Sequence, residues 1–92
     1  MHTHKQEWWQ FHKGNPQVYE LFKRFAFEAI TAGCQNFGTN AIIERIRWET
    51  QVVTSDVDFK INNNHAPYYA RLFMHDHPHH DSFFRTRQLL GE

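Results

Sequence analysis

Histidine is the residue type with the clearest chemical potential in this chain. There are eight histidines in 92 residues, and four lie in the run His75-Asp76-His77-Pro78-His79-His80-Asp81. Imidazole is a common metal ligand near neutral pH, and zinc takes three or four such groups. Pro78 interrupts the run, however, so the helical i, i+4 spacing that aligns two ligands is lost. A metal site made of His75, His77 and His79 is therefore a weaker hypothesis than a solvated turn at a helix end.

The sequence offers little for covalent or acid–base catalysis. Cys34 follows Gly33 at the end of a predicted helix, where the helix dipole opposes thiolate formation. Glu44 and Glu49 share a predicted helix with arginines, which is typical of surface ion pairs. There is no glycine-rich phosphate loop and no nucleophile elbow. We therefore expect a protein that is not an enzyme and needs no cofactor, and no small-molecule substrate is evident.

Composition and charge exclude several further classes. Hydrophobic residues make up 40% of the chain and aromatic residues 16%, which excludes a disordered segment. Ten Lys and Arg balance ten Asp and Glu, so bulk charge cannot hold nucleic acid as it does in a histone-like polycation. A single cysteine excludes an intrachain disulfide. No apolar run approaches the roughly 20 residues of a membrane span, and no secretory signal begins the chain. We expect a cytoplasmic protein without membrane contact.

Apolar spacing and capping residues predict two helices in the first half of the chain. Asn15-Pro16 is a favourable helix start, because Asn caps well and Pro suits the first helical position. Apolar residues then recur at intervals of three and four until Gly33, a suitable C-cap, which predicts a helix over 16–32. A second apolar stripe predicts a helix over 40–49.

The second half of the chain predicts strands around a third helix. Polar and apolar residues alternate strictly over 56–61, which indicates a short strand, and 83–88 is a second strand that would pair with it. The third helix begins after Asn62-Asn63-Asn64 and ends at Pro78. The expected fold is mainly α with a small β element. It is a three-helix, winged-helix-like (helix-turn-helix) domain over 15–92 with a short two-stranded antiparallel sheet.

In such a fold the third helix would read DNA. Its apolar face leaves Asn64, Tyr68, Arg71 and His75 on the opposite stripe. Asn and Arg suit adenine and guanine edges, and Tyr suits phosphates. The predicted nucleic-acid contacts are Lys60, Asn63, Asn64, Tyr68, Arg71, Arg85 and Arg87. The alternative is that the asparagines only cap a helix and that Arg71 pairs with an acid such as Asp76.

Four stretches of the sequence resemble small uncharacterised proteins encoded by bacteriophages and prophages. They are AIIERIRWE (41–49), FKINNN (59–64), YYARLF (68–73) and FFRTR (83–87). The resemblance covers roughly residues 15–90 and implies a phage or prophage origin and a bacterial host cell, without an established activity. The same stretches are similar to a generic winged-helix pattern. The leading hypothesis is therefore a small phage-type DNA-binding protein, a transcription regulator or replication accessory that binds double-stranded DNA.

Aromatic residues support a second hypothesis. Residues 1–14 form an expected aromatic tail with Trp8, Trp9 and Phe11, and Trp48 lies at the end of the second predicted helix. Trp is prominent in interface hot spots, so the tail either packs on the core or docks on a partner chain. The second hypothesis is a phage-encoded protein-binding module or inhibitor of a host or defence complex. A homodimer would also supply apolar area that so short a chain lacks.

Overall fold

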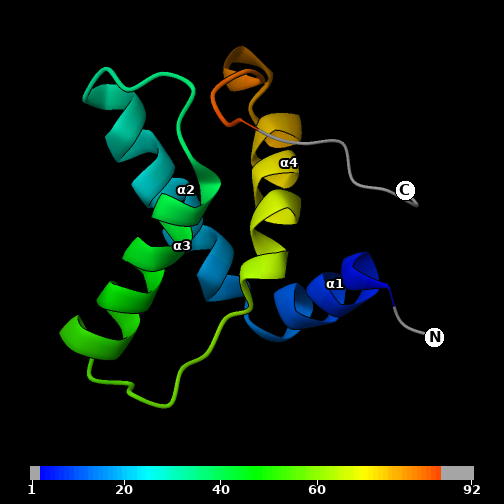
Figure 1. Cartoon of the computed structure of the whole chain (residues 1–92), viewed down its shortest axis with the longest axis vertical. Coiled ribbons are helices and arrows are strands. Elements are labelled where there is room, and N and C mark those ends of the chain that lie inside the picture. Colours follow the sequence, from blue (N-terminus) through cyan, green and yellow to red (C-terminus); the bar gives the residue numbers. More distant parts are fainter. Residues whose placement is uncertain (1–2, 86–92) are drawn as a thin grey trace.

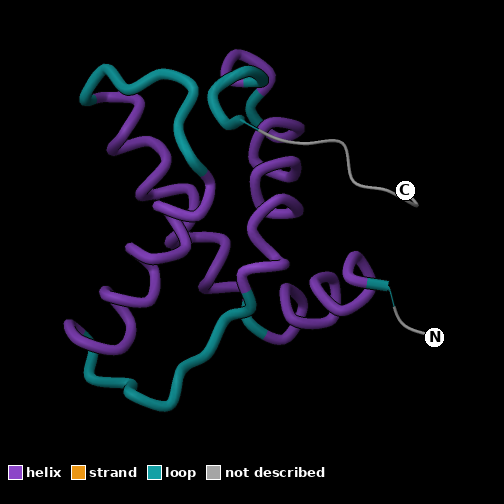
Figure 2. The backbone as a smooth tube through the Cα atoms, in the orientation of Figure 1, coloured by secondary structure: helices purple, strands orange, loops and turns teal. Residues whose placement is uncertain are grey.

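The computed structural model describes residues 3–85, which contain four α-helices. These are α1 (His4–Gly14), α2 (Pro16–Thr31), α3 (Thr39–Trp48) and α4 (Ala66–Asp76). A π-helical turn, η1 (Glu49–Val53), continues α3, and two 3-10 turns, η2 (Asn63–His65) and η3 (Pro78–His80), flank α4. Figures 1 and 2 show α2 and α3 on one side of α4, and α1 beside the start of α4 on the other side. Among the described residues, no helix combines the length and the hydropathy that crossing a membrane requires.

The helices predicted over 16–32 and 40–49 are confirmed by α2 and α3. Pro16 opens α2 as expected, directly after Asn15. The Asn15 side chain, however, serves the preceding helix, because its Nδ2 donates to the carbonyl oxygen of Phe11 at 3.0 Å. The third predicted helix is α4, which ends at Asp76 before Pro78.

The predicted strand over 56–61 is not formed, so the winged-helix prediction with its two-stranded sheet is wrong for the described residues. The Phe59 amide donates to the carbonyl oxygen of Asp56 at 3.2 Å, which closes a turn in this loop. Val57 is 74% exposed, whereas Ile61 is buried. Alternation of polar and apolar residues creates a strand only where a neighbouring strand completes the hydrogen bonds, and no residue of 3–85 forms one beside this loop.

The second predicted strand, 83–88, is described only up to residue 85, and that part forms a single bridge instead of a strand. Phe84 forms an isolated parallel bridge with Phe37, in which the Phe37 amide donates to the Phe83 carbonyl oxygen at 2.7 Å. The rings of Phe83 and Phe84 are both buried, so this segment follows the helical core rather than the loop at 56–61. Residues 86–88 lie outside the described part.

The segment before residue 15 is helical rather than an irregular tail. Thr3 and Gln6 form a capping box at the start of α1: the Gln6 amide donates to Thr3 Oγ1 at 3.1 Å, and the Thr3 amide donates to Gln6 Oε1 at 2.9 Å. The Thr-x-x-Gln spacing is a known helix-start signal, and the sequence reading missed it. Trp8 is buried, so α1 packs on the remaining helices through this side chain.

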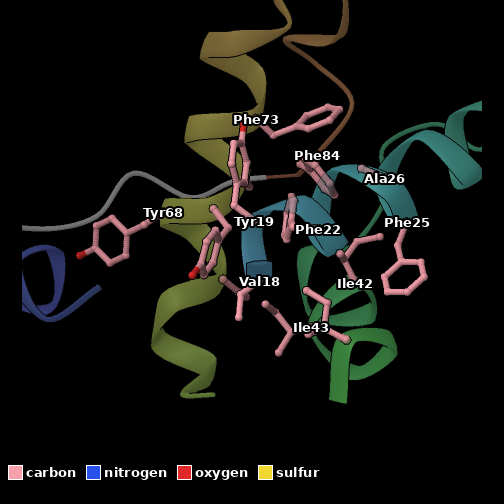
Figure 3. Packing of buried hydrophobic residues seen from close by; sticks show 14 of the residues in the cluster. Val18, Tyr19, Phe22, Phe25, Ala26, Ile42, Ile43, Tyr68, Phe73 and Phe84 are labelled. Atoms are coloured by element: carbon pink, nitrogen blue, oxygen red, sulfur yellow. The ribbon is translucent and has the colours of Figure 1, made fainter. Parts of the chain in front are cut away.

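Aromatic rings from three segments meet in the core around Phe22. Its ring centroid lies 5.6 Å from that of Tyr69, 6.3 Å from Phe73 and 5.3 Å from Phe84. Figure 3 shows Phe22 between α4 and the isoleucines of α3, with Tyr68 projecting away from it on the side of α1. The core is one continuous cluster. The Tyr69 ring lies 5.6 Å from both the Phe22 and the Trp8 rings, so α4 connects α1 to the core of α2 and α3.

Gly33 ends α2 in a Schellman motif. The Gly33 amide donates to the Ile30 carbonyl oxygen and the Cys34 amide donates to that of Ala29, both at 3.0 Å. This geometry needs a left-handed residue, and Gly33 has φ of 92°. Gly33 was predicted to end this helix, and it does so as the residue that directly follows the C-cap residue Ala32.

Gly33→Ala is expected to lower the free energy of unfolding by about 1–2 kcal/mol, because an L side chain is strained at this φ. A Cβ at Gly33 meets no atom within 4 Å, so backbone strain alone would produce the loss. Gly14→Ala is the matched control, since Gly14 is helical and its Cβ site is also open. It should leave the free energy unchanged or raise it by about 0.5 kcal/mol. Urea unfolding of both variants provides the measurement, and equal shifts would contradict the assignment.

Candidate functional site

The predicted DNA-reading face of α4 is not uniformly exposed: Asn64 and His75 at its two ends are exposed, but Tyr68 is buried. Tyr68 is only 7% exposed and stacks on Trp8 of α1, with ring centroids 5.7 Å apart. The buried residues of α4 are Ala66, Tyr68, Tyr69, Ala70 and Phe73. They occupy more than one side of the helix because α1 covers one flank and α2 with α3 cover the other. Arg71 is half-buried on the same helix.

The other predicted DNA contacts are dispersed. Lys60 and Asn64 are exposed, but the Oδ1 of Asn63 accepts a hydrogen bond from Arg47 Nη2 at 2.7 Å. Arg85 is exposed, and its segment lies at the opposite end of the molecule from the loop that carries Lys60 (Figure 1). Arg87 lies outside the described residues. The structure therefore brings no continuous basic face together from the predicted residues that it describes.

The histidine run does not converge on a common point. His75 is exposed, with Nδ1 3.5 Å from Asp76 Oδ1. His77 turns inward against Phe73, at a ring distance of 4.7 Å, while His79 stays exposed. Within residues 3–85 no group of three or more His, Cys, Asp or Glu side chains could hold a metal ion. The proposed ligands His75, His77 and His79 thus point in different directions, because the chain leaves α4 at His77 and enters a 3-10 turn at Pro78.

The four aromatic residues predicted to bind a partner divide into two pairs. Trp8 is 6% exposed and Phe11 is half-buried against the His65 ring at 5.1 Å, so both fold back on the core. Trp9 and Trp48 are exposed. Adjacent tryptophans in α1 therefore have opposite roles, since neighbouring positions on a helix point about 100° apart.

Trp48 is one of four exposed apolar side chains within ten residues of the sequence, a group that the sequence reading missed. We call Trp48, Val52, Val53 and Val57 the α3 apolar surface; their exposed fractions are 57%, 53%, 58% and 74%. The π-helical turn η1 continues α3 and carries both Val52 and Val53. The interval of four residues from Trp48 to Val52 is the signal that could have revealed it, because residues four apart share a helix face.

Paired charges lie beside the α3 apolar surface. Glu49 forms ion pairs with two arginines: Arg45 Nη1 lies 3.4 Å and Arg24 Nη1 lies 3.8 Å from its carboxylate oxygens. Both guanidinium groups also lie over the Phe25 ring, at 5.3 Å for Arg24 and 4.7 Å for Arg45. Arg47 is paired with Glu44 in the same helix. These arginines therefore carry little uncompensated positive charge to this side of the molecule.

A hollow of about 380 Å³ opens between α2 and α3. Its lining consists of Phe25, Ala29, Phe37, Ala41 and Ile42 together with Glu28, Cys34 and Arg45. Its largely apolar lining suits an apolar side chain rather than a phosphate or a metal ion.

A cluster of His12, Tyr19 and Asp76 joins α1 to α2 and α4. The Tyr19 hydroxyl donates to Asp76 Oδ2 at 2.7 Å, which lowers the pKa of that carboxyl. Burial, followed by this hydrogen bond, raises the pKa of Tyr19. His12 stacks on Trp8 at 5.4 Å and meets the Tyr19 ring edge-on at 5.6 Å. Burial lowers the pKa of His12, although the Asp76 carboxylate opposes this. The cluster holds α1 in place.

Comparisons with protein-family models, with curated proteins and with solved structures give no match to this chain. The geometry of the described residues is therefore the basis for a function, and four of their five exposed large apolar side chains belong to the α3 apolar surface.

Proposed function

We propose that the chain is a protein-binding module whose partner docks on the outer face of α3 and η1. One observation carries this proposal. Of the five exposed large apolar side chains among the described residues, four lie within the segment from Trp48 to Val57. Singly scattered apolar residues are ordinary on a protein surface, whereas exposed apolar side chains gathered on one segment are typical of an interaction site.

The size and composition of the α3 apolar surface support this role. Four side chains of this exposure present on the order of 400 Å², within the range of functional patches on small proteins. Trp48 offers the kind of rigid ring that anchors many interfaces. Leaving these side chains in water forgoes roughly 25 cal/mol per Å² that a partner would recover. An apolar contact thus provides a driving force without any charge on the partner.

Binding of double-stranded DNA stays a prediction, with less support from the geometry. Affinity for DNA depends mainly on unpaired cations that release counterions from phosphates. Arg24, Arg45 and Arg47 are engaged with carboxylates, and Tyr68 is buried. The protein-binding hypothesis instead rests on the exposed side chains of the α3 apolar surface. In this proposal the module acts in the cytoplasm of a bacterial host, where its partner is another protein or a second copy of the chain.

Site-specific photocrosslinking in bacterial cells tests the proposal. A benzophenone amino acid at Val53 is expected to form a discrete protein adduct, because this residue is 58% exposed within the α3 apolar surface. The same amino acid at Lys13, an exposed position of α1, is the matched control and should give none. Adding Trp48→Ser to the Val53 variant should abolish the adduct. Equal adducts at both positions, or an adduct that survives Trp48→Ser, would count against the proposed surface.

A further inference from the structure

We propose that the occupant of this face is a second copy of the chain, with two α3 helices crossing antiparallel about a two-fold axis. In this arrangement Trp48 of each copy enters the hollow between α2 and α3 of the other. The inference rests on the proposed function and names its partner.

The first support is that a projecting ring and a receiving hollow lie on one face of one helix. Ala41, Arg45, Trp48 and Val52 follow at intervals of four, three and four residues, which aligns them along α3 and η1. Ala41 and Arg45 line the hollow of about 380 Å³, and Trp48 is 57% exposed. Seven residues separate Ala41 from Trp48, which corresponds to about 10 Å along a helix.

Two-fold symmetry makes this spacing self-complementary. When two such helices lie antiparallel, the midpoint between Ala41 and Trp48 falls near residues 44 and 45. Each Trp48 then faces the partner's Ala41, so both rings and both hollows are used at once. An isologous contact of this kind closes on itself and stops at the dimer. A partner without the matching ring would leave the hollow unfilled.

The charges near the axis permit this approach. Arg45 would lie close to its counterpart, but each Arg45 is already 3.4 Å from Glu49 in its own chain. Arg47 is similarly paired with Glu44. Near the axis, the two copies would therefore bring together arginines that are already paired with carboxylates, rather than two unpaired cations. The formal net charge of the whole chain is zero, so no long-range repulsion separates the copies.

The exposed apolar area supplies part of what a dimer interface requires. A standard interface buries roughly 800 Å² on each partner, and somewhat more than half of that area is apolar. The α3 apolar surface as a whole supplies on the order of 400 Å², and Trp48 and Val52 are its two members on the stripe that would meet the partner. The walls of the hollow would contribute the remainder together with the paired charges.

Sedimentation velocity of the purified full chain tests the dimer between about 1 μM and about 1 mM. We expect the mass to rise from that of the 11.1 kDa chain to twice that value with concentration. Trp48→Ser removes the ring and Ala41→Arg fills the hollow; each should weaken dimerisation at least about 30-fold, as expected for an interface hot spot. Trp9→Ser is the matched control, because Trp9 is also exposed but lies on α1, and it should leave dimerisation unchanged.

A disulfide test reports the orientation independently. Arg45→Cys in a Cys34→Ser background places one thiol near the proposed axis, where the two copies should link on air oxidation. Gln17→Cys, at an exposed position of α2, should not link. A chain that stays monomeric over the whole concentration range overturns the inference, as does a dimer that tolerates both Trp48→Ser and Ala41→Arg. Photocrosslinking of a different protein at Val53 by a monomeric chain would leave the proposed function standing while this inference fails.

Discussion

Trp8→Ala is expected to lower the free energy of unfolding by about 3–5 kcal/mol. The indole is 6% exposed and lies between the His12 ring at 5.4 Å and the Tyr68 ring at 5.7 Å, with the Tyr69 ring edge-on at 5.6 Å. Removing it leaves a cavity where α1 meets α4. Domains of this size are stable by only about 5–15 kcal/mol, so the loss is a large part of the total. Urea unfolding followed by far-ultraviolet circular dichroism measures it.

Trp9→Ala is the control for this prediction. Trp9 is the next residue of the same helix, but 47% of it is exposed. Its replacement is expected to change the free energy of unfolding by less than about 1 kcal/mol. If the two variants lost the same stability, α1 would not be docked as the structure describes. A large loss for Trp8→Ala alone would show that α1 unfolds together with the other helices.

The second large effect is a loss of stability in weak acid. His12 lies in the last turn of α1 and His65 lies in η2, next to Phe11 of α1. The Nδ1 atom of each is buried without a hydrogen-bond partner. Burial lowers the pKa of both; nearby Asp76 opposes this at His12, while Glu7 opposes it and His4 adds to it at His65. The unfolded chain therefore binds protons before the folded chain does. Stability is complete above about pH 6.5 and falls as the pH drops through the lowered folded-state values.

The slope of this loss is measurable. Each histidine contributes up to about 1.4 kcal/mol per pH unit within its titration window. Urea unfolding at about pH 7.5, 6.5 and 5.5 should show the decline. His12→Gln and His65→Gln, made separately, should each flatten it, whereas His79→Gln changes an exposed side chain and should not. An unchanged slope in both buried-histidine variants would disprove the assignment. The lowered pKa of Asp76 acts separately, because its contribution is lost only below about pH 3.8.

The helices of the chain could largely be predicted from local signals. Asn15-Pro16 and Gly33 delimit α2, and Pro78 stops the chain from continuing α4. These signals act through residues within a few positions of one another, so the sequence carries them directly. The start of α1 was equally readable, because Thr3 and Gln6 have the capping-box spacing. The few apolar residues of that segment do not by themselves indicate a helix.

That residues 3–85 form no sheet could not be predicted from local signals. Alternation over 56–61 is local, but a strand needs a partner, and the choice of partner depends on the whole fold. Phe83 and Phe84 bury their rings in the helical core, and Phe84 forms its bridge with Phe37 rather than with this loop. The same reasoning applies to the predicted DNA face, since Tyr68 and Tyr69 are adjacent and both are buried. Periodicity indicates one buried face, whereas α4 is covered on two sides.

The sequence by itself determined where α2, α3 and α4 form and that the chain has an apolar, aromatic core. Only the tertiary structure decided which rings remain in water. It buried Trp8 and left Trp48 exposed with Val52, Val53 and Val57. The physical reason is that helix ends depend on short-range hydrogen bonds and backbone preferences, whereas burial depends on which distant elements cover each face.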